Sequence, residues 1–272
     1  MKINEVKLKK RDNDSHKGSY GTVLVLAGSK GMAGAALMCG KSALKSGAGM
    51  VKFCVPDEIV DILQVGLPEA TCISRDLETL NFHDYEAIAL GPGLGINKSN
   101  IGIIKKILNE YTGKLVLDAD GLNCIMKYTL YGNLSQTNAE VIITPHVGEA
   151  QRLLEVDQIE DRLEAAKEMA KIFGITVVMK GAGSIVVRGD DVYINNTGNP
   201  GMATGGAGDS LTGIIAALLA QGYDTYEAAK LGVFLHGHAG DICATEIGQI
   251  GMTAMDIVDC IPRVFKLLSN NY

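Results

Sequence analysis

A glycine-rich stretch in front of a single acidic residue is the strongest chemical signal in the sequence. Residues 199–222, NPGMATGGAGDSLTGIIAALLAQG, carry four glycines within eight positions, followed by Asp209 and an apolar run. Glycine lets the backbone approach a ligand closely, and the free N–H groups at the start of a helix attract anions. The pattern therefore predicts a phosphate site formed by Gly205, Gly206, Ala207 and Gly208.

Asp209 lies in the first turn of the helix that this segment predicts. The helix dipole lowers the pKa of a carboxyl group there, so we expect Asp209 to be ionised unless it is desolvated. A carboxylate beside a phosphate site can accept the proton of a substrate hydroxyl as its oxygen attacks phosphorus. The alternative is a tight turn in which Asp209 only stabilises the helix start. The density of glycines favours catalysis, although the spacing matches neither a Walker loop nor a G-x-G-x-x-G fingerprint.

Polar side chains also follow two other predicted strands. The segment VVMKGAGS, residues 177–184, ends a strand in Lys180 and two glycines, which suits the phosphates or ribose of a nucleotide. A β-turn with a solvated lysine explains this segment equally well. The segment LDADGLN places Asp118, Asp120 and Asn123 at a strand end, where their oxygens suit Mg²⁺ bound through water. An Asx-type turn is the alternative there.

Histidines occur in two further segments. In TPHVGEAQRL, His146 could bind substrate and Glu149 could organise hydrated Mg²⁺, or Glu149 is only an acid of a first helical turn. His236 and His238 are two positions apart and do not share a helix face, so we expect helix packing there and no zinc site.

These residues must be positioned by alternating strands and helices. Continuous apolar runs of strand length, such as TVLVLAG (22–28), alternate with longer helical patterns, such as DRLEAAKEMAKIFG (161–174). Continuous apolar strands predict a single α/β domain over residues 1–272, with a mostly parallel sheet and helices on both faces. Ligands bind at the carboxyl ends of the strands in such folds, and the glycine-rich and acidic loops all follow predicted strands.

Composition excludes several classes of protein. The chain has 272 residues, 47% of them hydrophobic, and a net charge of −6, which argues against general attraction to nucleic acid. The six cysteines form no Cys-x-x-Cys motif, so we expect reduced thiols in the core. No secretory signal and no apolar run of membrane-spanning length is visible, so a cytoplasmic protein is expected.

Taken together, these segments resemble the NAD(P)H-hydrate dehydratases, a branch of the ribokinase-like superfamily. The opening HKGSYGTVLVLAGSKGMAGAALMCGKSALKSGAGMV is followed by GPGLG, LVLDADGLN, ITPHVGEAQRL, VVMKGAGSIV and NPGMATGGAGDSLTG. Each motif is weak alone, but the ordered set is specific and covers nearly the whole chain. The HKGxxG opening and the GAA segment separate this branch from the thiazole and pyrimidine kinases.

The resemblance implies repair of S-NADHX and S-NADPHX, the hydrated forms of reduced nicotinamide cofactors. ADP or ATP would phosphorylate the ring hydroxyl with the support of Mg²⁺, and loss of phosphate would restore the double bond. Many relatives carry an N-terminal epimerase domain, for which we expect no room here, so a separate epimerase would act in the same pathway. A homo-oligomer, typically a tetramer, is also implied.

The resemblance also assigns roles to residues. Asp209 would activate the hydroxyl, and residues 205–208 would form the anion hole. The adenine nucleotide would be held by Lys180, Gly181, Ala182, Gly183, Ser184 and Gly208. The hydrated cofactor would be contacted by Ala36, Gly93, His146 and Asp209, and Glu149 would act on Mg²⁺ through water. Ala207 departs from the threonine that is common in relatives, and nucleotide affinity is where we expect this to matter.

Two other functions fit parts of the pattern. A small-molecule kinase of the same superfamily, of the hydroxyethylthiazole or hydroxymethylpyrimidine type, would leave the phosphate on its product. A non-catalytic nucleotide-binding regulator would keep the fold, but it would have no need of a base at Asp209.

Overall fold

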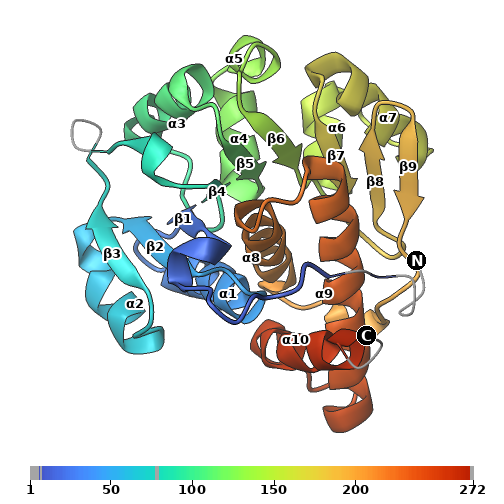
Figure 1. The fold of residues 1–272 in the computed structure, drawn as a ribbon. Helices are drawn as coiled ribbons and strands as arrows, with labels where there is room; N and C mark the ends of the chain where they lie inside the picture. Colours follow the sequence, from blue (N-terminus) through green and yellow to red (C-terminus); the bar gives the residue numbers. More distant parts are fainter. Residues whose placement is uncertain (1–5, 7, 77–79, 270–272) are drawn as a thin grey trace.

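The centre of the molecule is a single sheet. The structure, a computed structural model, describes residue 6 and the ranges 8–76 and 80–269. Within these residues nine strands form the order β3-β2-β1-β4-β5-β6-β7-β8-β9 (Figure 1). Strands β1 to β7 pair in parallel, and β8 and β9 continue the sheet as antiparallel strands. Their bounds are β1 Thr22–Leu26, β2 Met50–Val55, β3 Thr71–Ser74, β4 Ala87–Leu90, β5 Lys114–Leu117, β6 Glu140–Ile143, β7 Thr176–Met179, β8 Ile185–Arg188 and β9 Asp191–Ile194.

Helices cover both faces of this sheet (Figure 1). One face carries α1 Ala33–Lys45, α2 Val60–Gly66, α8 Ala207–Ala220, α9 Thr225–Ile247 and α10 Ala254–Ser269. The other face carries α3 Lys98–Glu110, α4 Ala119–Lys127, α5 Tyr131–Ser135, α6 Val147–Leu154 and α7 Arg162–Phe173. Short 3₁₀ turns lie at Lys17–Tyr20, Asp57–Ile59, Phe82–Asp84 and Pro200–Met202.

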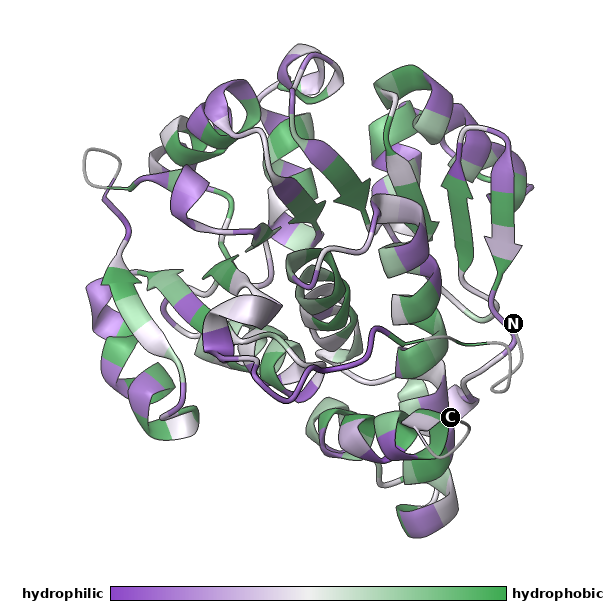
Figure 2. Cartoon of the chain, viewed as in Figure 1, coloured by the Kyte–Doolittle hydropathy of each residue, from purple (hydrophilic) through white to green (hydrophobic). Residues whose placement is uncertain are grey.

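The apolar strands follow from burial on both faces. In β1, Val23 and Val25 belong to the core beneath α1 and α8, whereas Leu24 and Leu26 belong to the core beneath α3 to α7. Successive side chains of a strand point to opposite faces, so a strand covered on both sides is apolar at every position. Figure 2 shows apolar residues along the inner strands and α8, with polar residues on the peripheral helices.

The predicted fold class and most predicted elements are confirmed. The sheet is mostly parallel with helices on both faces, and Gly174 ends α7 with the left-handed φ of 68°. All six cysteines are free and five are buried, as expected for core thiols. Strand β3 was not predicted, because its pattern TCIS is short and none of its side chains is fully buried. Within the described residues, no helix is both long and apolar enough to span a membrane.

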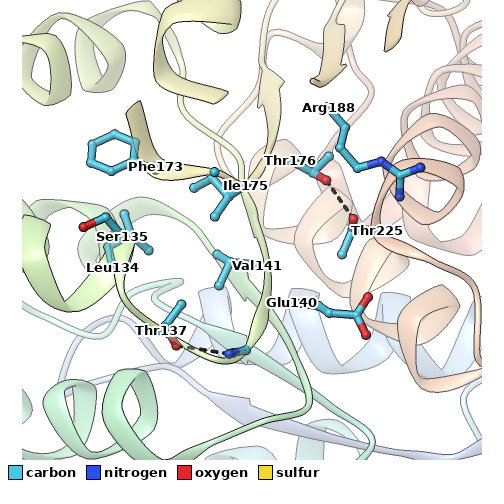
Figure 3. A pocket seen from close by; sticks show the side chains of 12 residues that line it. Leu134, Ser135, Thr137, Glu140, Val141, Phe173, Ile175, Thr176, Arg188 and Thr225 are labelled. Carbon is cyan, nitrogen blue, oxygen red and sulfur yellow. Dashed lines mark hydrogen bonds between the residues drawn. The ribbon is translucent and has the colours of Figure 1, made fainter. Parts of the chain in front are cut away.

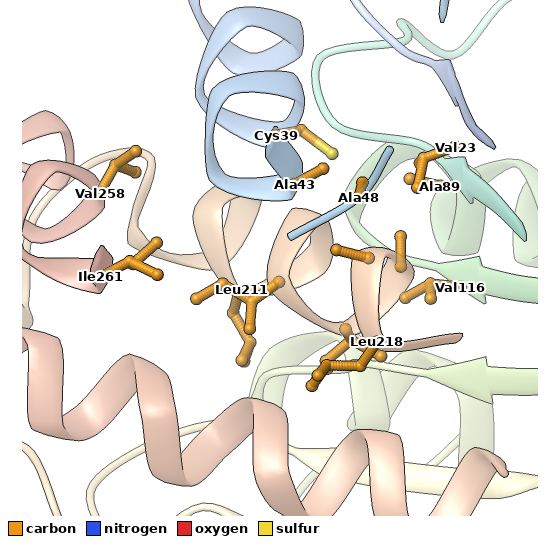
Figure 4. Close-up of a cluster of buried hydrophobic side chains, with 14 of the residues drawn as sticks. Val23, Cys39, Ala43, Ala48, Ala89, Val116, Leu211, Leu218, Val258 and Ile261 are labelled. Atoms are coloured by element: carbon orange, nitrogen blue, oxygen red, sulfur yellow. The ribbon is translucent and has the colours of Figure 1, made fainter. Parts of the chain in front are cut away.

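Helix α8 is enclosed by the rest of the molecule, and α1 approaches it closely. Every residue of α8 from Ser210 to Ala220 is buried. A Cβ atom built on Gly213 would lie 2.0 Å from the Cys39 carbonyl oxygen and 2.1 Å from Ser42 Oγ. Figure 4 shows the small side chains Cys39 and Ala43 of α1 in this core. The two helices therefore pack backbone against backbone, which fixes the position at which α8 begins.

Replacing Gly213 with alanine tests this contact. Gly213→Ala forces α1 and α8 apart, and overpacking of this kind costs about 1–3 kcal/mol of the free energy of unfolding. Gly132→Ala in α5 is the matched control, because nothing lies within 4 Å of a Cβ built there. We expect urea denaturation to show a loss for Gly213→Ala and no loss for Gly132→Ala. Equal midpoints for the two variants would contradict the close packing.

Candidate functional site

The glycine-rich loop presents free backbone N–H groups at the start of α8. Gly206 is the residue before the helix and has a φ of 90°, and a Cβ on it would lie 2.3 Å from Met38 Sδ. Among the described residues, the N–H groups of Gly205, Gly206 and Gly208 have no hydrogen-bond partner. The Ala207 N–H donates to the Thr204 carbonyl at 3.4 Å. Three of the four predicted anion-binding N–H groups are thus open to a ligand.

Asp209 lies in the first turn of α8, as predicted, and the largest influence on its pKa is burial. Burial, with a further contribution from the charge of Asp118 and against the opposing charge of Lys180, raises the pKa of Asp209 to about 7. Asp120 and Glu149 add smaller effects in the same direction as Asp118. The condition attached to the expectation therefore applies: Asp209 is desolvated, and its pKa is raised and not lowered. A carboxyl group with a pKa near neutrality is well suited to general base catalysis.

Asp118 connects three elements beneath Asp209. It follows β5, is 1% exposed, and forms an ion pair with Lys180 Nζ through Oδ1. Its Oδ2 accepts a hydrogen bond of 2.7 Å from Thr212 Oγ1 in α8. Burial alone would raise the pKa of Asp118, but the Lys180 charge and the hydrogen bonds from Thr212 and Thr144 bring it below its ordinary value. Asp118 is therefore an ionised structural partner and not the Asx turn weighed above.

Lys180 is not the solvated lysine of the alternative interpretation. Burial opposes its charge, but Asp118 and Glu149 together raise the pKa of Lys180 above its ordinary value. A Cβ built on Gly208 would lie 3.3 Å from Lys180 Nζ. A positively charged ammonium group therefore lies beside the open N–H groups, where it can attract a phosphate.

His146 and Glu149 form the start of α6. The His146 N–H donates to Glu149 Oε2 at 2.8 Å, and the Glu149 N–H donates to His146 Nδ1 at 3.3 Å. The Glu149 carboxylate is only 4% exposed and lies 3.8 Å from Lys180 Nζ, whereas the His146 side chain is 54% exposed. The imidazole ring is therefore open to a ligand, whereas the buried Glu149 carboxylate is held by the His146 N–H and lies near Lys180.

The positions assigned to the hydrated cofactor behave differently from one another. Gly93 follows β4 and packs on the start of α1, and its carbonyl accepts a hydrogen bond of 2.9 Å from Ser29 Oγ. Ala36 is completely buried, so none of its atoms is open to a ligand in this conformation. Gly34 and Ala35 beside it are accessible, and they are the part of α1 that a ligand can reach.

Two residues of this region were not identified from the sequence. Thr212 holds Asp118, and its position three residues after Asp209 on the same helix face was an available signal. Arg162 donates hydrogen bonds to the Lys180 and Ala182 carbonyls at 3.3 and 2.7 Å. A basic residue at the first position of a helix opposes the helix dipole, and this unfavourable placement was the signal for Arg162.

His236 lies against the start of α8. The side chain is 8% exposed, and its Nε2 is 3.0 Å from Ser210 Oγ. Burial lowers the pKa of His236 to about 4, so the ring is neutral at physiological pH. This geometry agrees with the predicted helix packing near a site.

Cavities occur at both the carboxyl and the amino ends of the strands. One of about 480 Å³ lies at the carboxyl ends of β1 to β4, beyond Gly93, and is lined by Ser29, Lys30, Arg75 and Asn100, among others. Another of about 290 Å³ lies at the amino ends of β6 and β7, next to Glu140 and Thr176 (Figure 3). Of these two cavities, only the first lies at the same end of the strands as Asp209.

Comparison with known proteins finds solved structures with this architecture. A crystal structure of the ADP/ATP-dependent NAD(P)H-hydrate dehydratase of Bacillus subtilis, co-crystallised with ATP and Mg²⁺, superposes with a TM-score of 0.86 at 33% identity. The match covers 98% of this chain and 96% of that one. The fold and the site therefore define a ribokinase-like α/β protein.

The family follows from the sequence relatives. The family model for NAD(P)H-hydrate dehydratase matches residues 23–263. The ADP-dependent (S)-NAD(P)H-hydrate dehydratase of Neisseria meningitidis is 40% identical over 92% of this chain and 86% of its own. The bifunctional NAD(P)H-hydrate repair enzyme of Moorella thermoacetica is 40% identical over 96% of this chain, which spans 52% of that protein. The chain belongs to the NAD(P)H-hydrate dehydratase family, and it spans about half the length of the bifunctional relatives it matches.

The raised pKa of Asp209 predicts opposite effects of one substitution on stability and on activity. The folded-state pKa of about 7 lies above the ordinary value of 3.8, so folding loses stability as pH rises between these values. Asp209→Asn removes the titrating carboxyl group, so it abolishes this loss of stability and also removes the general base. We expect a higher melting temperature than wild type at pH 8, and a difference that shrinks as pH falls towards 4. A difference independent of pH would contradict the raised pKa.

Proposed function

We propose that the chain converts S-NADHX and S-NADPHX to NADH and NADPH, with ADP as the phosphoryl donor and ATP as the alternative donor. The observation that carries the proposal is the Asp209 carboxyl group, poised near neutral pKa beside three open N–H groups and the Lys180 ammonium. The names of the Neisseria and Bacillus relatives support both the reaction and the nucleotide.

In the proposed mechanism, Asp209 accepts the proton of the ring hydroxyl as its oxygen attacks the terminal phosphorus of the nucleotide. The N–H groups of Gly205, Gly206 and Gly208 and the Lys180 ammonium stabilise the charge on the transferring group. The C–O bond of the phosphate ester then breaks with its electron pair leaving on the phosphate. Loss of a proton from the neighbouring ring carbon restores the double bond.

Magnesium fits this site through the nucleotide. No group of three acidic, histidine or cysteine side chains that could hold a metal ion occurs within the described part of the chain. Glu149 already accepts the His146 N–H, so its carboxylate suits contact through water more than direct ligation. Mg²⁺ carried by the phosphates would neutralise their charge, with Glu149 orienting its water.

The order of the strands supports separate binding regions for the two ligands along the carboxyl ends of the strands. Lys180 and residues 181–184 follow β7, so the adenine nucleotide is proposed on that side of Asp209. Gly93 and the cavity of about 480 Å³ lie on the side of β4 and β1. The hydrated ring would lie next to Gly93 and His146, and the remote half of the dinucleotide would enter that cavity.

Further parts of the proposal concern the surroundings of the enzyme. We propose a homotetramer in the cytoplasm, acting after an epimerase that supplies the S hydrate. The mass of the assembly in light scattering tests the first part.

The proposal is tested by turnover of purified protein with synthetic S-NADHX, Mg²⁺ and either ADP or ATP. The return of the NADH absorbance band with ADP is expected. Asp209→Ala should lower kcat by about 10²–10⁴, the usual contribution of a general base. Asp61→Ala is the matched control, because Asp61 is an exposed acid in the first turn of α2.

Three results would contradict the proposal. Near-normal turnover of Asp209→Ala would show that Asp209 is not the general base. A stable phosphorylated alcohol in place of NADH would identify a small-molecule kinase. Nucleotide binding by wild type without turnover of any substrate would favour a regulator.

A further inference from the structure

The loop between β7 and β8 has every carbonyl oxygen turned to the protein. Four of them, those of Met179, Lys180, Ala182 and Gly183, accept hydrogen bonds from Arg162 at 3.3, 3.3, 2.7 and 3.4 Å. The Gly181 carbonyl accepts from Ser184 Oγ at 3.0 Å. The Ser184 carbonyl accepts from the Asn195 N–H at 2.8 Å.

The N–H groups of the same loop have the opposite arrangement. The Lys180 N–H donates to the Pro145 carbonyl at 2.8 Å. No hydrogen-bond acceptor faces the N–H groups of residues 181–184 in the part of the chain that the structure describes. Because peptide units are planar, turning the carbonyls one way turns the N–H groups the other way. Successive free N–H groups of this kind form concave sites for anions.

Arg162 is built into this position. Its Nε is buried and has no hydrogen-bond partner among the described residues, and the guanidinium forms no ion pair with any described carboxylate. A Cβ on Gly181, which has a φ of 141°, would lie 3.0 Å from Arg162 Nη2. Among the described residues, backbone carbonyls are therefore the hydrogen-bond partners of this positive charge, and it lies behind the free N–H groups.

We propose that Arg162 is a positioning residue for the adenine nucleotide. It gathers the loop carbonyls so that the N–H groups of residues 181–184 face the phosphates or the ribose, and its charge strengthens their attraction for an anion. This inference rests on the proposed nucleotide site. Arg162 acts through the loop and touches neither ligand, so its loss should affect nucleotide binding more than the chemical step.

Arg162→Met tests the inference, because methionine keeps an unbranched apolar stem and removes all four hydrogen bonds. We expect KM for ADP to rise about tenfold or more, equivalent to about 1.4 kcal/mol of binding free energy. At saturating ADP, kcat should stay within about threefold, and KM for S-NADHX should not change. Arg162→Lys, which can still reach part of the carbonyl set, should give an intermediate KM for ADP.

Arg188→Met is the matched control. Arg188 lies on the neighbouring strand β8 in an exposed ion pair of 2.8 Å with Asp224, so the variant loses the same charge nearby. Its KM for ADP should equal that of wild type. Thermal unfolding of each variant separates loss of the fold from loss of the site.

Hydrogen exchange gives a readout that does not depend on turnover. ADP should protect the amides of residues 181–184 in wild type, and this protection should be lost in Arg162→Met at the same ADP concentration. Unchanged protection and unchanged KM in a folded Arg162→Met protein would overturn the positioning role. Wild-type protein that bound no adenine nucleotide would instead overturn the proposed nucleotide site itself.

Discussion

One buried carboxylate holds the candidate site together. Asp118 joins the end of β5 to β7 through Lys180 and to α8 through Thr212. A buried ion pair contributes little net stability, but removal of one partner leaves an uncompensated charge, which is strongly unfavourable. The position of Lys180 beside Gly208, and the field that acts on Asp209, both depend on this carboxylate.

The same charges set the chemical character of Asp209. A surface aspartate would be fully ionised and a poor base at neutral pH, whereas burial and the Asp118 charge bring the pKa of Asp209 to about 7. The raised pKa lowers the free energy of unfolding at pH values above the ordinary carboxyl pKa. The close packing of α1 on α8 at Gly213 supplies the rigidity that keeps the first turn of α8 in this environment.

Local patterns predicted the parts of the structure that depend on neighbouring residues. Glycines followed by an apolar helix predicted the loop before Asp209, and alternating buried strands and helices predicted the α/β sheet. The pairing of Asp118 with Lys180 joins residues 62 positions apart, and it depends on a strand order that composition and periodicity do not reveal.

The same limit explains the residues that were missed, and it bears on Ala36, whose assignment stays a prediction. Arg162 acts because α7 packs against the β7–β8 hairpin, which is a tertiary contact. Ala36 was assigned from a resemblance, but it lies with Cys39, Gly40 and Ala43 among the buried residues of α1. Helical periodicity turns this position inwards and leaves Gly34 and Ala35 accessible.

The hairpin between β7 and β8 differs from the other loops of the site because it does not enter a helix. Residues 180–184 connect β7 directly to the antiparallel strand β8, with Met179 opposite Ile185. No macrodipole therefore reinforces their N–H groups, and the side chains of Arg162 and Lys180 supply the positive potential instead. Insertion or deletion of one residue would shift the register of this hairpin and turn its peptide planes over. The hairpin should therefore tolerate a change of length far less well than a substitution of its side chains.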